Sequence, residues 1–429
     1  MPRPETSLPV AAMADLLENS GFRAFWLANL LSNLGTSAFV LAINWLTVKQ
    51  YGALGIATLA LAYGLPQLLL QLVGGTISDR INRRHLYSIT ESAMLLVAVL
   101  ILVASLHGLV PLWLLALVNG CNGAISAFDT PARTALITDM VPGSEVVVAQ
   151  QLYSLSANLT NVFGPALGGI LLSLGPDARS HEEIAFAFNA LSFLPLLVCI
   201  PFLPSHQPAL SASAQRPPFL RSLREGLSFV RHRPDLRTLL ALLALLMLLG
   251  MPFQGLLPVF VNRHLSLEGG HGFYAALLSA VGLGAFVGSL LGIGLGEGRR
   301  PGLLLALTTA GLGGSVLLLV GSGVIHWASL AAFLAGACGN LAIGLDNALL
   351  QGGTPELMQG RVNAIANLSK GLQSFSVSAA SYLMHRLSAV GHNGIGYQLV
   401  QAPMAIALLI GVALLWPRLG RLAPPAAEA

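Results

Sequence analysis

The chain has 429 residues, of which 55% are apolar and only 9% are charged. Soluble domains carry roughly 25% charged residues, so a surface this poor in charge would aggregate in water. We attribute the formal net charge of +4 to a bias of arginine toward one side of a membrane, and not to nucleic-acid binding.

Sequence patterns of common enzymes and pumps are absent. The chain contains no C-x-x-C or H-E-x-x-H metal pattern and no G-x-x-x-x-G-K-[ST] phosphate loop, which argues against an ATP-driven pump. No nucleophile with a matching base stands out, so we expect no enzyme activity, no cofactor and no metal. Cys121, Cys199 and Cys338 lie in apolar stretches, which argues against a disulfide framework.

Residues 1–21 are predicted to form a short polar tail. They contain no long apolar core, so we expect no cleavable signal peptide. A membrane span requires roughly 20 apolar residues, because the hydrocarbon core is about 30 Å thick and a helix rises about 1.5 Å per residue. Twelve segments meet this requirement. They are residues 22–48, 54–78, 85–106, 110–140, 144–174, 184–203, 238–262, 272–296, 302–322, 324–352, 360–388 and 395–417.

A longer, basic and proline-containing stretch, residues 204–237, separates the sixth span from the seventh. Within it, residues 217–233 predict an amphipathic helix that lies on the inner membrane surface. We therefore expect an all-α membrane protein with twelve transmembrane helices in two pseudo-symmetric six-helix bundles. The bundles would comprise residues 22–203 and 238–417, and residues 418–429 would form a second cytoplasmic tail.

The placement of arginine and lysine predicts the orientation. If both termini are cytoplasmic, sixteen arginines lie on the inner side, and the outer side holds only Lys49, Arg179, Arg263 and Arg386. This imbalance follows the positive-inside rule. It predicts a multi-pass membrane protein with both the tail 1–21 and the linker 204–237 in the cytoplasm.

The two halves share a pattern in their fourth spans. Cys121, within Asn-Gly-Cys-Asn, precedes Asp129 by eight residues, and Cys338, within Ala-Cys-Gly-Asn, precedes Asp346 by the same number. Internal repeats of this kind are how secondary transporters build two bundles that rock about a central site.

Several motifs resemble the major facilitator superfamily over nearly the whole chain. Residues 75–84 resemble its signature between spans two and three, with Asn82 where a glycine is usual. Residues 164–169 resemble the span-five signature of its proton antiporters, with Thr160 in place of that motif's first glycine. Residues 222–237, with Asp-Met-Val-Pro at 139–142, are similar to the subfamily of bacterial transmembrane secretion effectors that includes the enterobactin exporter. Many antiporters of the family use an arginine in span four for proton coupling. That arginine should fall near Ala116, and it is absent here.

The resemblance implies a gating latch at the inner ends of the spans. Its members would be Gly75, Asp79, Arg80, Arg83, Arg84 and Asp139. Asp79 and Arg83 are four residues apart, which places them together if the helix continues. The alternative is that these charges only establish the topology.

The antiporter motif consists of Gly164, Pro165, Gly168 and Gly169. Small residues let helices approach closely, and proline removes a backbone donor. The motif therefore predicts a tight seal and pivot, with ordinary helix packing as the alternative.

Four charged residues lie inside predicted spans, where each costs about 2.5–3.5 kcal/mol on insertion scales. They are Asp129, Arg133, Asp346 and Lys370. Burial disfavours an ionised carboxylate and a neighbouring cation favours it, which suits a group that binds and releases protons. We expect Asp129, tuned by Arg133, to carry the proton, and Asp346 with Lys370 to form a second pair or to line the cavity. Both pairs could instead be static bridges.

Uncharged polar residues in the spans are candidates for a substrate cavity. They are Asn29, Asn33, Asn158, Asn161 and Gln254. Asn29 and Asn33 share one helix face, as do Asn158 and Asn161, and either pair could instead form interhelical hydrogen bonds. Glu91 lies about two turns into the third span, and we expect it to reach toward the inner surface.

These features predict a monomeric secondary transporter whose partners are a small-molecule substrate, protons and membrane lipids. The subfamily resemblance implies that it exports a siderophore, a drug or a lipid-like compound across a bacterial inner membrane, by proton antiport and alternating access. An importer or facilitator of the same fold and a non-transporting membrane sensor are the alternatives.

Overall fold

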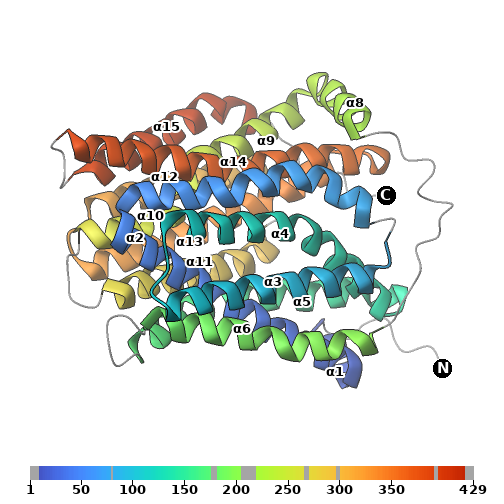
Figure 1. Cartoon of the computed structure of the whole chain (residues 1–429). Helices are drawn as coiled ribbons and strands as arrows, with labels where there is room; N and C mark the ends of the chain where they lie inside the picture. Colours follow the sequence, from blue (N-terminus) through green and yellow to red (C-terminus); the bar gives the residue numbers. More distant parts are fainter. Residues whose placement is uncertain are drawn as a thin grey trace. The chain divides into compact units, whose positions relative to one another are not determined.

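The computed structural model describes residues 9–78, 81–174, 181–203, 219–264, 270–295, 300–390 and 395–420 (Figure 1). Over these residues the secondary structure is entirely helical, which confirms the all-α prediction. Ten of the described helices or helical runs are long and apolar enough to cross a membrane. The protein is therefore a multi-pass membrane protein.

The helices up to the linker follow the predicted order, with short connections between them. They are α1 (Pro9–Glu18), α2 (Ser20–Ser78), α3 (Arg83–Leu106), α4 (Leu112–Met140), η1 (Gly143–Glu145), α5 (Val146–Ser173), α6 (His181–Cys199) and η2 (Ile200–Phe202). Asn82 is the N-cap residue of α3, because its side chain accepts hydrogen bonds from the N–H groups of Arg84 and His85.

Helix α2 is 59 residues long and contains one sharp kink, at Gly52. Gly52 has φ 61° and ψ −150°, a conformation that residues with a side chain rarely adopt. The kink falls between the two spans expected over residues 22–48 and 54–78. A straight helix of this length would measure roughly 90 Å, about three times the thickness of the hydrocarbon core.

The helices after the linker are α8 (Phe219–Arg231), α9 (Pro234–Leu245), η3 (Leu246–Gly250), α10 (Phe253–His264), α11 (Gly270–Leu295), α12 (Pro301–Gly321), α13 (Ile325–Gly352), α14 (Glu356–Ala389) and α15 (Gly396–Leu419). The expected span 238–262 is divided between α9 and α10. Between them the chain forms a π-helical turn, η3, and Pro252 follows with no N–H to donate.

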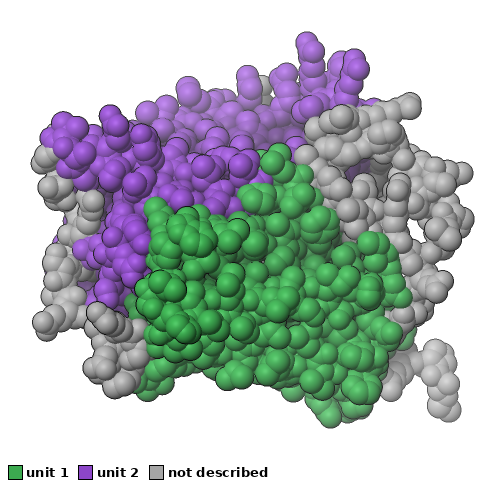
Figure 2. Space-filling model, viewed as in Figure 1, with its two compact units in different colours: residues 1–43, 66–216 green, residues 44–65, 217–429 purple. Residues whose placement is uncertain are grey.

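The chain forms two compact units (Figure 2). The first contains residues 1–43 and 66–216, and the second contains residues 44–65 and 217–429. The middle of α2 thus belongs to the second unit. There the Trp45 ring stacks on Tyr274 of α11 at a centroid distance of 6.2 Å, and Asn262 Nδ2 donates to the Val48 carbonyl oxygen at 3.4 Å.

Within the second unit, glycines allow α11 and α13 to approach closely. A Cβ atom on Gly284 of α11 would overlap the Phe333 carbonyl oxygen of α13, and one on Gly336 of α13 would overlap the Val281 carbonyl oxygen of α11. Small residues at such a contact bring two backbones together, which is the usual basis of helix packing in membranes.

Candidate functional site

The first unit contains a buried ion pair on α4. The Arg133 Nη2 atom lies 3.0 Å from Asp129 Oδ2, and the Asp129 side chain is only 4% exposed. The other carboxylate oxygen, Oδ1, accepts a hydrogen bond from Thr90 of α3 at 3.1 Å. The spacing of four residues places both charged groups on one face of α4, as the sequence predicts.

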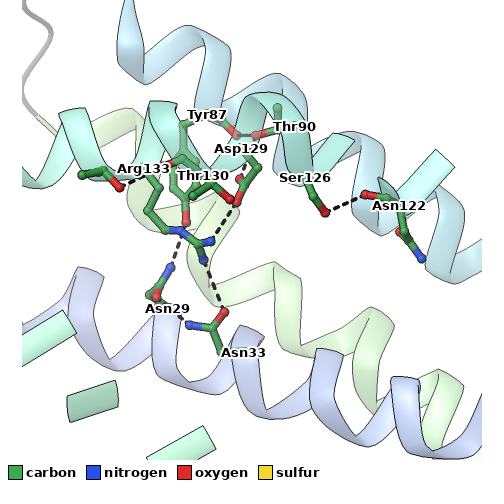
Figure 3. A network of polar contacts seen from close by, with 10 residues as sticks. Asn29, Asn33, Tyr87, Thr90, Asn122, Ser126, Asp129, Thr130 and Arg133 are labelled. Carbon is green, nitrogen blue, oxygen red and sulfur yellow. Dashed lines mark hydrogen bonds and ion pairs between the residues drawn. The ribbon is translucent and has the colours of Figure 1, made fainter. Parts of the chain in front are cut away.

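Arg133 also connects α4 to α2, as Figure 3 shows, and it contacts α5 as well. Its Nη1 atom donates to Asn33 Oδ1 of α2 at 3.3 Å, and its guanidinium carbon lies 5.3 Å from the centre of the Tyr153 ring of α5. Asn33 Nδ2 donates to Asn29 Oδ1 at 2.8 Å. The guanidinium therefore contacts two other helices, α2 and α5, besides its partner Asp129 on α4.

Asn29 extends this network to α3 (Figure 3). Its Nδ2 atom donates to the Tyr87 hydroxyl oxygen at 2.9 Å, and Glu91, one turn further along α3, is an electrostatic neighbour of Tyr87. We use the name Asp129 cluster for the residues joined by these contacts. They are Asn29, Asn33, Tyr87, Thr90, Glu91, Asp129, Arg133 and Tyr153.

The expected position of Glu91 is wrong. The sequence predicts that it reaches toward the inner surface, but the structure buries it to 2% exposure within the Asp129 cluster. Its Oε2 atom has no hydrogen-bond partner among the described residues. The physical reason is the rotation of α3, which turns the face carrying Tyr87 and Glu91 toward α2 and α4.

The sequence analysis also missed Tyr87, Thr90 and Tyr153. A signal was available for two of them, because Tyr87, Thr90 and Glu91 follow one another at spacings of three and one and so lie on one face of a helix. A polar face inside an otherwise apolar span indicates a polar partner. Tyr153 gives no such signal, since an aromatic residue in a span usually packs against apolar neighbours.

In the second unit, Asp346 of α13 is completely buried at 0% exposure. Neither of its carboxylate oxygens has a hydrogen-bond partner among the described residues. Lys370 of α14 is the cation whose charge acts on Asp346, but neither carboxylate oxygen of Asp346 hydrogen-bonds to it. The structure thus places them as electrostatic neighbours and not as a hydrogen-bonded pair.

The expected latch is described in part. The Arg83 Nη1 atom lies 2.6 Å from Asp139 Oδ1, which joins the first turn of α3 to the end of α4. Arg84 Nη1 donates to the carbonyl oxygens of Pro201 and Leu203 at 3.1 and 3.0 Å. Gly75 lies in α2, and Asp79 and Arg80 lie outside the described residues.

The second unit has an ion pair of its own at the start of α14. The Arg361 Nη2 atom lies 3.0 Å from Glu225 Oε2 of α8. Helix α8 corresponds to the amphipathic helix that the sequence predicts over residues 217–233. The ion pair attaches this helix to α14, next to Gly226, where a Cβ atom would come within 3.2 Å of the Arg361 backbone.

The antiporter motif is buried at the contact between α5 and α2. Gly164, Pro165, Gly168 and Gly169 are all buried. A Cβ atom on Gly164 would overlap the Ser37 side chain, and one on Gly168 would lie 3.1 Å from the Ala38 Cα atom. The motif therefore allows close approach of two helices, a geometry that suits both a seal and ordinary packing.

The remaining cavity candidates do not join the Asp129 cluster. Asn158 is half-buried and Asn161 is exposed, and neither hydrogen-bonds to a residue of the cluster. Gln254 lies half-buried at the start of α10 in the second unit. Of the five candidates, Asn29 and Asn33 are the two that the structure connects to buried charges.

The profile of the family described as transmembrane secretion effector matches residues 11–419. The chain is a member of this family, within the major facilitator superfamily. Like the members of this family and its structural neighbours, the protein is a transporter and not an enzyme.

Three curated relatives share low identity with this transporter. The chain is 28% identical to the MFS-type transporter YfiS of Bacillus subtilis over 48% of either chain. It is 25% identical to the staphyloferrin A transporter of Staphylococcus aureus over 56% of this chain and 59% of the relative. It is 26% identical to the enterobactin exporter EntS of Citrobacter koseri over 82% of either chain. The matches to the first two thus span about half of those proteins.

The solved structures agree on the fold. A bacterial homologue of the human lysosomal transporter Spinster, in an inward-facing and occupied conformation, superposes with a TM-score of 0.68 at 15% identity. The match covers 99% of this chain and 100% of the other. At this identity the likeness establishes a shared fold only.

Proposed function

We propose that this transporter exports a small amphipathic molecule by alternating access, in exchange for protons. The observation that carries the proposal is the Asp129 cluster, an ion pair and a second carboxyl group buried among membrane-spanning helices. Ionisable groups at such depth are costly and mark ion or substrate pathways. The sequence offers no phosphate loop for ATP, so an ion gradient is the natural energy source.

The proposed topology has twelve crossings. Ten segments are long and apolar enough. The kink at Gly52 would divide the first of them into two crossings, and α14, which is 34 residues long but more polar, would supply another. The crossings would form six-helix bundles over residues 22–203 and 238–417 in a bacterial inner membrane. The arginine distribution favours cytoplasmic termini and a cytoplasmic linker.

The substrate class rests on relatives. Two of the matched proteins are named for siderophores, staphyloferrin A and enterobactin. We therefore propose a siderophore, a drug or a lipid-like compound of comparable size. Asn29 and Asn33 would border its path next to Arg133, and Gln254, Asn158 and Asn161 are further candidates for the cavity wall.

The remaining motifs would control the motion. The ion pair of Arg83 with Asp139 would hold α3 against α4 in one conformation, together with Asp79, Arg80 and Arg84. The glycines at 164, 168 and 169 would seal the contact of α5 with α2 against leakage. The monomer would suffice, since each bundle supplies its own buried carboxylate, Asp129 or Asp346.

The proposal is tested with a panel of siderophores, dyes and drugs in cells that lack their own efflux pumps. Expression should lower the accumulation of at least one compound, and a protonophore should abolish this effect. The Asp129→Asn variant should lose it, whereas Glu183→Gln, at the opposite end of the same unit, should retain it. Raised accumulation would indicate an importer, and protonophore-insensitive flux a facilitator. No effect on any compound would favour a sensor.

A further inference from the structure

The Asp129 cluster contains two buried carboxyl groups but only one cation. Asp129 is 3% exposed and Glu91 is 2% exposed. Among the described residues, the charged groups that act on Glu91 are Asp129 and Arg133 of α4, and the neighbouring phenols are Tyr87 and Tyr153. Helix α6 packs beside α3 and carries no charged side chain after Glu183. With both carboxyl groups ionised, the cluster would carry one uncompensated negative charge.

The two carboxyl groups differ in how they are bonded. Asp129 uses both oxygens, one toward Arg133 at 3.0 Å and one toward Thr90 at 3.1 Å. Glu91 has Tyr87 as a neighbour, while its Oε2 atom has no hydrogen-bond partner within the part of the chain that the structure describes. Since the Tyr87 oxygen already accepts from Asn29, its O–H is free to donate to Glu91. Burying a charge without a paired cation is strongly unfavourable, and a proton on Oε2 removes that charge.

We propose that Glu91 is the group that takes up and releases the transported proton, and that Asp129 serves as the ion-pair partner of Arg133. The inference rests on the proposed proton exchange and replaces Asp129 with Glu91 as the carrier. One proton adds to Glu91 Oε2, and the net charge of the cluster changes from −1 to zero. No other bond is made or broken.

The position of Arg133 gives this proton a mechanical consequence. Arg133 holds Asp129 and also donates to Asn33 of α2 at 3.3 Å. When Glu91 is ionised, the guanidinium is drawn toward a second carboxylate, which weakens its bond to Asn33. Protonation of Glu91 thus strengthens the bond between Arg133 of α4 and Asn33 of α2, and loss of the proton weakens it. Helix α2 is shared by both units, since it contributes residues to each of them.

The test is infrared difference spectroscopy on the full-length protein in lipid vesicles, with isotope-labelled glutamate to identify glutamate bands. No substrate is required. As the pH is raised, the wild type should lose a carboxylic-acid C=O band that shifts with the glutamate label. Glu91→Gln should lack this band, and Glu182→Gln, which alters a similarly buried glutamate of the same unit, should retain it.

A second variant keeps the test decisive if Glu91→Gln does not fold. In Glu91→Asp the titrating band should disappear from the labelled-glutamate spectrum and appear with labelled aspartate. A band of full amplitude in Glu91→Gln, an unmoved band in Glu91→Asp, or no titrating glutamate band in the wild type would overturn the assignment.

The spectra and the efflux panel fail independently. A Glu91 band that titrates without any protonophore-sensitive efflux would support the proton site and refute the proposed export. Protonophore-sensitive efflux with a band that does not depend on Glu91 would support proton-driven export and refute Glu91 as the carrier.

Discussion

Asp129 and Asp346 occupy the same place in a sequence pattern that occurs once in each compact unit, yet their surroundings differ. Each follows a cysteine by eight residues on the same type of helix, and each is buried. Asp129 is bonded through both oxygens to Arg133 and Thr90. Asp346 has no hydrogen-bond partner among the described residues, and its neighbouring cation, Lys370, does not hydrogen-bond to it.

One sequence position accounts for much of this difference. Four residues after Asp129 stands Arg133, whereas four residues after Asp346 stands Leu350, which is 2% exposed. Both copies of the pattern therefore have an aspartate, but a leucine stands in the second copy where the first has the arginine. We infer that the first half holds a permanent ion pair, and that the carboxyl group of the second half depends on a lysine from another helix.

The largest expected effect comes from making the first half resemble the second. Arg133→Leu copies Leu350 and leaves Asp129 as an unpaired buried charge, so we expect a loss of about 3–5 kcal/mol in the free energy of unfolding. Denaturant titration in detergent micelles measures it. The double variant Asp129→Leu, Arg133→Leu should recover most of the loss, and exposed Arg224→Leu serves as the control. A loss no larger than the control's would contradict the ion-pair interpretation.

Replacing each aspartate by asparagine should change the free energy of unfolding less, and in opposite directions for Asp129 and Asp346. Asp129→Asn weakens bonds to Arg133 and Thr90 and should lower the free energy of unfolding by about 1.5–3 kcal/mol. Asp346→Asn breaks no described hydrogen bond and should leave the stability unchanged or raise it by about 1 kcal/mol. The same titration compares them. Equal destabilisation by both variants would show that Asp346 has a structural partner after all.

The glycine contacts of the two units provide a third comparison. Gly336→Ala would press a Cβ atom against the Val281 backbone and should cost about 1–3 kcal/mol. Gly168→Ala meets Ala38 at 3.1 Å and should cost less. Gly344→Ala, on the same helix as Gly336 with no atom within 4 Å, should be neutral or slightly stabilising. Thermal unfolding ranks the three, and a reversed order would refute backbone contact as the cause.

The smallest effects are expected at the two half-exposed ion pairs. Arg83 and Arg361 have side-chain exposures of 31% and 32%, so Arg83→Gln and Arg361→Gln should each change stability by less than about 1 kcal/mol. A latch at Arg83 requires that efflux falls in Arg83→Gln while stability stays constant. Normal efflux in this variant would reduce the Arg83 pair to a determinant of topology.

Part of the site could be predicted from local spacing. Asp129 and Arg133 meet because residues four apart on a helix are neighbours whatever the rest of the chain does. The same rule joins Asn29 to Asn33, as the 2.8 Å hydrogen bond shows. Contacts between helices obey no such rule. Spacing therefore did not reveal that Glu91 is buried, and it left open whether Asp346 and Lys370 form a pair or line the cavity.

The sequence by itself determined the solvent, the helical class and the family, because apolar runs of this length are stable only as helices in lipid. It also predicted that Asp129 and Asp346 lie inside the spans, and the structure buries both. Tertiary structure alone decided their partners, since the rotation of each helix about its axis selects the side chains that meet. The rotation of α3 about its axis places Glu91 near Arg133. Neither the composition nor the spacing within one helix predicts that rotation.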